Sequence, residues 1–389
     1  MKIIVFSPTS TQLSLMGEQP LGGADSVLLK MIESLAEHHE VEAYLPIKKE
    51  IEGEFRGASC YPFMDLFDGE KECDIIIHNR KVFPIPNTIK YKKSVFYSQD
   101  TVDTPCFKGL KGHRNALDFY DKIWVLSKFH KENMLTEFDI PDEKFLILGN
   151  FSPDQKIGCG KLCARTSGSN KNPDGFIYCG EYFNKELRLC LKCNKKKPLQ
   201  FIYASTPFRG LDVLLKAWTF IIEKYPTATL HIFSSMAIYG AEELDDLHFG
   251  KMFRDMKGGR FKNLIFHGSV PQEEMLEVMR ESFMLLYPNT YPETYCNVLM
   301  EARAARTPFI TTDLGCLTET GSDAGFYIPG NARSPEYLQR FLQTLDLVID
   351  DLKFYKSLQN NCYPIRSIQD YKKDLLNEIN GLNKEEIKD

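Results

Sequence analysis

The segment 292–313, PETYCNVLMEARAARTPFITTD, has the most informative pattern of charged and apolar residues in the chain. Its two glutamates, Glu293 and Glu301, have seven residues between them and flank the start of an expected short helix. Thr294 is the expected N-cap of that helix, and Asn297 is expected at its third position. A proline then ends the helix, and the apolar residues after it predict a short buried strand.

This arrangement suits a ligand that carries phosphates and hydroxyl groups. The N-terminus of a helix offers free backbone N–H groups and the positive end of a dipole, which favours a diphosphate. A carboxylate can accept two hydrogen bonds from neighbouring hydroxyls of a ribose or a sugar. The two glutamates could therefore bracket a nucleotide sugar, although their spacing alone also fits two surface residues of an ordinary helix.

The longer stretch YPNTYPETYCNVLMEARAARTPFITTDLGCLTE, residues 287–319, resembles the signature of the family 4 retaining glycosyltransferases. That family has two glutamates with seven residues between them, then a small-residue helix, a proline, a buried strand and a Thr-Asp-x-Gly turn. All of these occur here in the same order. The resemblance implies the GT-B fold, in which two doubly wound Rossmann-like α/β domains face a cleft.

Length and composition are typical of a two-domain globular protein. The chain has 389 residues, of which 43% are hydrophobic and 26% charged. Its net charge of −5 argues against nucleic acid as a partner, and no apolar run is long enough to predict a transmembrane segment. The start MKIIVFSPTS lacks the long apolar region of a signal peptide and predicts a first strand. We therefore expect a cytoplasmic protein, whose 11 cysteines are reduced or bound to metal.

Residues 1–154 are expected to form an N-terminal, acceptor-binding domain. Strands are predicted at 2–7, 41–45, 74–78, 94–97, 123–126 and 145–148, with helices at 26–38 and about 128–137. This alternation favours a parallel, doubly wound sheet.

The glycines Gly22 and Gly23 precede the first predicted helix. A strand, a glycine loop and a helix can bring backbone amides up to a phosphate, although glycine there could simply permit a turn. The dinucleotide fingerprint G-x-G-x-x-G is absent. The loop does resemble the glycine-alanine loop of family 4 chains, which implies that it faces the donor diphosphate.

In a doubly wound sheet, ligands bind beyond the carboxyl ends of the strands. That rule indicates residues 78–80 and 127–128, together with Ser98, Gln99 and Asp100. Family members often place a histidine after the strand that precedes Gln99, and its replacement here leaves open which side chain contacts the reacting centre. His113, in a polar loop, is a further candidate on the acceptor side, although a lone histidine in a loop is more often simply solvated.

Residues 155–197 interrupt the alternation and predict a cysteine-rich insertion between the domains. Its five cysteines are Cys159, Cys163, Cys179, Cys190 and Cys193. The pairs CGKLC and CLKC each resemble half of a metal-binding knuckle, and four thiolates suffice for a closed tetrahedral zinc site. We expect one structural zinc ion; the alternative is a loop with incidental reduced cysteines.

Residues 198–364 are expected to form the C-terminal, donor-binding domain. Strands are predicted from 199 and at 229–233, 263–267, 283–287, 308–312 and 325–328, with helices at 272–281 and over most of 335–358. Family members carry a basic residue followed by glycine after the first strand, and Arg209 matches it. A fixed cation is needed where carboxylates lie beside a diphosphate, although a surface arginine in a turn is the simpler alternative. Residues 365–389 contain an amphipathic helix at 367–380 that would pack back on the first domain and stop at Gly381.

The resemblance implies roles for single residues. Glu293 and Arg209 are the expected catalytic residues, the glutamate beside the donor sugar and the arginine beside the diphosphate. The expected donor-binding residues are Glu301, Gly22, Gly23, Ser205, Thr206, Thr294 and Asn297. No Asp-x-Asp triplet occurs, so no catalytic metal is expected.

The predicted activity is that of a retaining hexosyltransferase in glycan biosynthesis, which moves a sugar from a UDP- or GDP-sugar to a glycan, glycoprotein or other hydroxyl acceptor. Two alternatives remain: a nucleotide-sugar 2-epimerase of the same fold, and a non-catalytic protein that binds partners through the cysteine-rich insertion. The sequence does not identify the sugar, the nucleotide or the acceptor.

Overall fold

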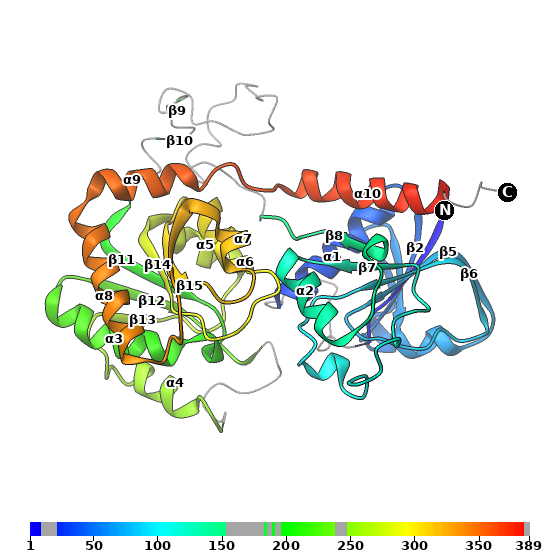
Figure 1. Cartoon of the computed structure of the whole chain (residues 1–389), viewed down its shortest axis with the longest axis horizontal. Coiled ribbons are helices and arrows are strands. Elements are labelled where there is room, and N and C mark those ends of the chain that lie inside the picture. Colours follow the sequence, from blue (N-terminus) through cyan, green and yellow to red (C-terminus); the bar gives the residue numbers. More distant parts are fainter. Residues whose placement is uncertain (9–21, 153–182, 185–188, 191–195, 238–246, 385–389) are drawn as a thin grey trace.

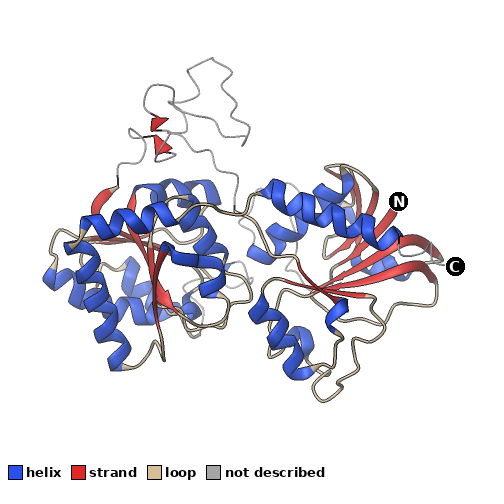
Figure 2. Cartoon of the chain, turned by 45° about the horizontal axis from the view of Figure 1, so that its top comes forward, coloured by secondary structure: helices blue, strands red, loops and turns tan. Residues whose placement is uncertain are grey.

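The computed structural model describes residues 1–8, 22–152, 183–184, 189–190, 196–237 and 247–384. Within these residues the chain forms two large α/β units side by side, each built on its own sheet (Figure 1). We call them the N-terminal half and the C-terminal half. Helices cover both faces of each sheet (Figure 2).

The sheet of the N-terminal half has eight strands. In spatial order they are β3 (Gly53–Phe55), β4 (Ala58–Pro62), β2 (Glu40–Leu45), β1 (Lys2–Phe6), β5 (Lys71–Asn79), β6 (Ile89–Tyr97), β7 (Lys122–Val125) and β8 (Phe145–Ile147). Only β3 and β4 pair antiparallel; the other neighbours are parallel. The sequence did not predict β3 and β4, which are short and contain no long run of apolar residues, whereas β1, with four consecutive apolar residues, was predicted.

The sheet of the C-terminal half has six parallel strands. Their spatial order is β13 (Leu264–Phe266), β12 (Thr229–Phe233), β11 (Lys197–Ala204), β14 (Ser282–Tyr287), β15 (Phe309–Thr312) and β16 (Gly325–Ile328). Counted along the chain this is 3-2-1-4-5-6, the doubly wound order, and its direction reverses between β11 and β14. Ligands bind at such a switch point, so the loops after these two strands are the first place to look for a site.

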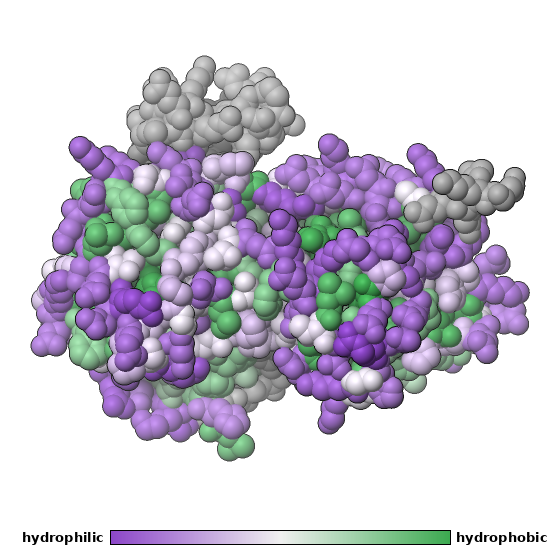
Figure 3. All heavy atoms as spheres, viewed as in Figure 1, coloured by the Kyte–Doolittle hydropathy of each residue, from purple (hydrophilic) through white to green (hydrophobic). Residues whose placement is uncertain are grey.

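The helices of the described residues are α1 (Gly23–Ala36), α2 (Lys128–Glu137), α3 (Leu211–Lys224), α4 (Gly250–Lys257), α5 (Gln272–Glu281), α6 (Asn297–Ala304), α7 (Leu317–Gly321), α8 (Pro335–Asp350), α9 (Leu352–Asn361) and α10 (Ile368–Lys384). Their inner faces are apolar, and on the face shown in Figure 3 hydrophobic residues lie in small groups among hydrophilic ones. The prediction that 335–358 is mostly helical is confirmed, and the range is divided between α8 and α9 at Asp351, whose side chain caps α9.

The last helix returns to the N-terminal half. Between α9 and α10 the chain crosses from one unit to the other (Figure 1). Tyr371, Leu375 and Ile379 of α10 are fully buried in the same apolar core as Ile3 of β1. The predicted stop at Gly381 is wrong, because the helix continues through this glycine to Lys384. Among the described helices, none combines the length and apolar character that crossing a membrane requires.

Most of the predicted cysteine-rich insertion lies outside the described residues. Apart from Lys196 and Lys197 at its end, the second of which begins β11, the structure gives there only the backbone of a short antiparallel pair, β9 (Phe183–Asn184) and β10 (Leu189–Cys190). The side chains of Cys159, Cys163, Cys179, Cys190 and Cys193 are not described. The described part of the chain holds no cluster of three or more His, Cys, Asp or Glu side chains placed to bind a metal ion.

Candidate functional site

A cavity of about 1320 Å³ lies between the two halves. The N-terminal half lines it with the start of α1 and the segments that follow β5 and β6. The C-terminal half contributes the loops after β11, β12, β13 and β14, together with α6. The cavity therefore lies at the carboxyl ends of both sheets, where doubly wound folds bind ligands.

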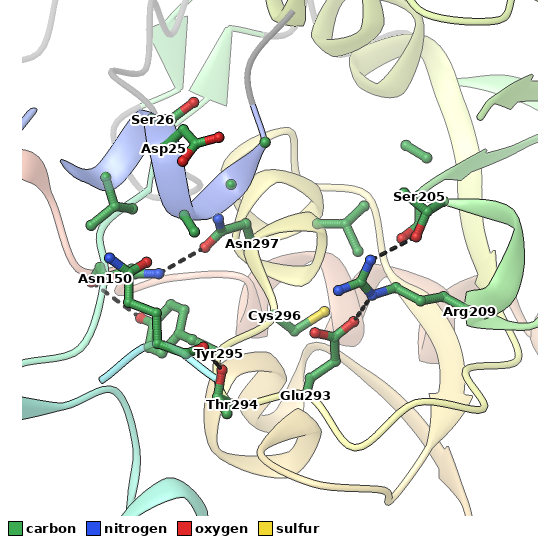
Figure 4. A pocket seen from close by; sticks show the side chains of 18 of the residues that line it. Asp25, Ser26, Asn150, Ser205, Arg209, Glu293, Thr294, Tyr295, Cys296 and Asn297 are labelled. Carbon is green, nitrogen blue, oxygen red and sulfur yellow. Dashed lines mark hydrogen bonds and ion pairs between the residues drawn. The ribbon is translucent and has the colours of Figure 1, made fainter. Parts of the chain in front are cut away.

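Arg209 and Glu293 follow the two strands at the switch point of the C-terminal sheet. Arg209 ends a short turn after β11, and Glu293 lies in the loop between β14 and α6. Arg209 Nε donates to Glu293 Oε1 at 2.5 Å (Figure 4). The Tyr287 hydroxyl donates to the same oxygen at 2.9 Å. Glu293 is only 7% exposed, so it is a buried carboxylate held by two donors at the cavity wall.

The guanidinium of Arg209 is fixed on several sides. Its Nη1 donates to Thr206 Oγ1 at 2.6 Å. Its carbon lies 4.8 Å from the centroid of the Phe208 ring and 5.0 Å from that of Tyr291, within the range of cation–π attraction. Thr206 and its neighbour Ser205 line the cavity, as does Arg209 itself. A positive charge is thus held in place before any ligand enters.

Glu301 is a second buried carboxylate of the same cavity. It is 9% exposed, and its Oε1 accepts a hydrogen bond from Gln272 Nε2 at 2.6 Å. Burial raises the pKa of Glu301 to about 7, although the bond from Gln272 acts in the opposite direction. Burial disfavours the charged form of Glu301. A ligand whose hydroxyls donate hydrogen bonds to this carboxylate would stabilise the charged form. No pattern in the sequence indicated Gln272, because its contact with Glu301 joins two separate helices.

The start of the glutamate helix differs from the prediction. α6 begins at Asn297, with Cys296 as a cap that makes no side-chain capping bond. Thr294 is therefore not the N-cap, and its hydroxyl donates instead to the Gln99 carbonyl of the N-terminal half at 2.8 Å. Asn297 is the first helical residue rather than the third, and its Oδ1 accepts from Asn150 Nδ2 at 3.1 Å (Figure 4). Both residues line the cavity.

The glycines of the first loop lie against the start of α6. Gly22 is the cap of α1 and Gly23 is its first residue, so α1 begins three residues earlier than predicted. A Cβ at Gly23 would lie 2.4 Å from the side-chain amide Nδ2 of Asn297, so any other residue there would require the Asn297 side chain to move. The absence of a side chain at Gly23 thus lets the first turns of α1 and α6 meet at the cavity, where their N–H groups suit an anion.

Two of the three residues predicted on the acceptor side line the cavity. Gln99 donates to Asn79 Oδ1 at 2.7 Å, and Asp100 receives two hydrogen bonds from Arg80, at 2.8 and 3.0 Å. His113 is exposed on a turn and is not among the lining residues. Arg80 also lines the cavity. Its position after a strand was indicated by the strand-end rule, but its ion pair with Asp100 could not be predicted from the sequence.

The family comparison concerns the C-terminal half. Residues 200–346, a little over a third of the chain, match the family described as "Glycosyl transferases group 1". No curated protein matches the chain.

Solved structures with the same fold match nearly the whole chain. A glycosyltransferase from Rickettsia africae is 13% identical, with a TM-score of 0.61 and coverage of 98% of both chains. HepE from Anabaena, in complex with UDP-glucose, is 13% identical, with a TM-score of 0.62 and coverage of 98% of this chain and 100% of that one. WaaG, a glycosyltransferase involved in lipopolysaccharide biosynthesis, is 14% identical, with a TM-score of 0.56 and coverage of 93% of this chain and 94% of that one. The predicted GT-B architecture is confirmed by these structures, and the group 1 match lies within the C-terminal half; neither comparison singles out family 4.

Proposed function

We propose that this chain is a retaining glycosyltransferase of hexosyltransferase type, which transfers a sugar from a nucleotide-sugar donor to a hydroxyl acceptor. One observation carries the proposal: the Arg209–Glu293 pair stands at the switch point of the C-terminal sheet, inside the cavity that both halves line. Uridine diphosphate is the nucleotide we favour, because HepE was solved with UDP-glucose and another similar structure, GtfA, with UDP and GlcNAc.

In this proposal the diphosphate lies between Arg209 and the first turns of α1 and α6. The guanidinium and the helix N–H groups then stabilise the charge that develops on the leaving phosphate. Glu301 accepts hydrogen bonds from the ribose hydroxyls, and Glu293 lies beside the donor sugar. The acceptor enters from the side of Gln99 and Asp100.

Neither a side-chain general base nor a catalytic metal is part of the proposal. In the family that the sequence resembles, the leaving phosphate is thought to assist the acceptor, and the sugar keeps its anomeric configuration. A cytoplasmic location and a glycan or glycoprotein acceptor remain predictions from the sequence.

The first test is a thermal-shift panel of UDP, GDP, ADP, TDP and CMP, with chelator in every sample and in each control. A ligand at a hundredfold excess over its Kd stabilises the folded state by about 2.7 kcal/mol, so one diphosphate should raise the Tm by several degrees. If only added magnesium or manganese restores a shift, the metal-independent mechanism is wrong. If no nucleotide acts under any condition, the chain is a binding protein on an enzyme fold.

The second test uses the sugar nucleotide of the best-binding diphosphate and a panel of hydroxyl acceptors. NMR of the product should show the anomeric configuration of the donor. Inversion would refute the retaining mechanism. Release of the nucleotide together with a 2-epimerised sugar would identify an epimerase instead.

A further inference from the structure

A carboxylate of the C-terminal half caps a helix of the N-terminal half. Glu319, on α7, accepts hydrogen bonds from the backbone N–H groups of Lys128 and Phe129, both at 2.9 Å. These are the first two residues of α2, whose own cap Ser127 accepts from the next N–H, that of His130, at 3.0 Å. A carboxylate at a helix N-terminus is favourable both as an acceptor and against the dipole. The first turn of α2 is therefore completed by the opposite half.

The cap of α2 also holds the residue that follows Glu293. The Ser127 hydroxyl donates to the Thr294 carbonyl at 2.8 Å, and both residues are buried. The Thr294 hydroxyl in turn donates to the carbonyl of Gln99, again in the N-terminal half, at 2.8 Å. The N-terminal half thus binds both the backbone and the side chain next to Glu293.

The other side of Glu293 leads directly to Glu319. Glu293 pairs with Gly315 in an isolated parallel bridge, and Cys316 N–H donates to the Glu293 carbonyl at 2.9 Å. Gly315 has a φ of 69°, and a Cβ there would lie 2.6 Å from that carbonyl oxygen, so only glycine permits the contact. The same turn runs into α7. Glu293 therefore lies in a closed ring of contacts that passes through Glu319 and the first turn of α2.

α2 also supports the cavity wall on the acceptor side. His130 Nδ1 accepts from Leu126 N–H at 3.2 Å, so its Nε2 carries the proton and donates to the Asp100 carbonyl at 3.0 Å. Asn133 Oδ1 accepts from Val102 N–H at 2.9 Å. A displacement of α2 would consequently move the segment that carries Asp100.

We infer that Glu319 is a positioning residue: by fastening the first turn of α2 to the C-terminal half, it sets the distance between Glu293 and the acceptor wall around Asp100. The inference rests on the proposed function, since it assumes that the transfer takes place between these two walls. Glu319 itself is exposed and does not line the cavity, so it acts through its neighbours.

The test compares Glu319→Ala and Glu319→Gln with the control Glu277→Ala, which removes an exposed carboxylate from α5. Hydrogen exchange of the Lys128 and Phe129 amides is measured first. We expect exchange there to rise at least fivefold in Glu319→Ala, to rise less in Glu319→Gln, which keeps one acceptor oxygen, and to stay unchanged in Glu277→Ala. The rest of the chain should exchange as in the wild type.

Steady-state kinetics with the donor found above supply the second measurement. In Glu319→Ala we expect kcat to fall at least fivefold with less than a threefold change in the donor KM, because Arg209 and Glu301 stay in place. Glu319→Gln should recover part of kcat. The inference would be overturned if the Lys128 and Phe129 amides exchange in Glu319→Ala as slowly as in the wild type. It would also be overturned if they exchange faster while kcat stays unchanged. A wild-type chain without transfer activity refutes the proposed function instead, and the exchange measurement then still decides whether Glu319 joins the halves.

Discussion

Replacing Glu301 by glutamine should separate the stability of the free protein from its ability to bind a nucleotide. The carboxyl group is buried, and its pKa of about 7 lies above the ordinary value of 4.5 because burial penalises its charge. Glutamine has nearly the same shape and can still accept the bond from Gln272 through its oxygen. The substitution therefore removes the titration while keeping the packing.

The sign of the effect follows from the two pKa values. Below about pH 4.5 the group is protonated whether the chain is folded or unfolded, so it contributes nothing. Between about pH 4.5 and 7 the folded state holds a proton that the unfolded chain releases, and stability falls as the pH rises. Above pH 7 the full penalty applies, about 3 kcal/mol. Glu301→Gln should thus exceed the wild type in unfolding free energy by about 3 kcal/mol at pH 8, but only by about 1 kcal/mol at pH 5.

Urea denaturation at pH 5 and pH 8, followed by tryptophan fluorescence, measures this difference. Trp218 lies in the buried core of the C-terminal half and reports on its unfolding. Glu277→Gln, on an exposed face of α5, is the control and should leave the pH profile unchanged. Equal pH profiles for Glu301→Gln and the wild type would refute the reasoning. Calorimetry should also show that the wild type binds the nucleotide more tightly as the pH rises from 5 to 8, and that the variant does not, because hydroxyl donors favour the charged carboxylate.

The remaining predictions concern the arginine, the first glutamate, a glycine and the insertion. Arg209→Ala should weaken nucleoside diphosphate and donor binding together, with a smaller loss for the bare nucleoside; equal losses by calorimetry would assign Arg209 another role. Glu293→Ala should lower kcat more than donor affinity in a folded protein, so an unchanged transfer rate would remove it from the site. Gly210→Ala should cost at least about 2 kcal/mol by denaturation, because a Cβ there would lie 2.0 Å from the Pro288 carbonyl oxygen, whereas Gly259→Ala, at a similarly positive φ in open space, should cost only about 1 kcal/mol. Elemental analysis should find about one zinc per chain, held by cysteines of residues 155–197, and a content near zero would refute the zinc prediction.

The sequence by itself determined the class of fold, and it indicated several residues that line the cavity. Apolar runs of strand length, such as the one at β1, alternate with amphipathic helices, and this local pattern is enough to predict parallel α/β sheets. It also locates strand ends, where ligands bind in such folds, and so it indicated Gln99 and Asp100, whereas Arg209 was indicated by the resemblance to a known family. His113 was proposed from its residue type in a polar loop, and such a loop pattern does not indicate whether its side chains line a cavity; His113 is not among the lining residues.

The tertiary structure decided which of these residues meet. Arg209 and Glu293 form an ion pair across the switch point, Gln272 joins Glu301 between two helices, and Gly23 lies against Asn297 from the opposite half. Thr294 shows the limit of local reasoning most clearly. Its sequence context favours an N-cap, but a carbonyl of the N-terminal half, 195 positions away in sequence, accepts its hydroxyl instead. Contacts between the halves depend on how the two sheets are oriented relative to each other. The local sequence pattern of apolar and polar residues predicts each sheet separately and contains no information on that orientation.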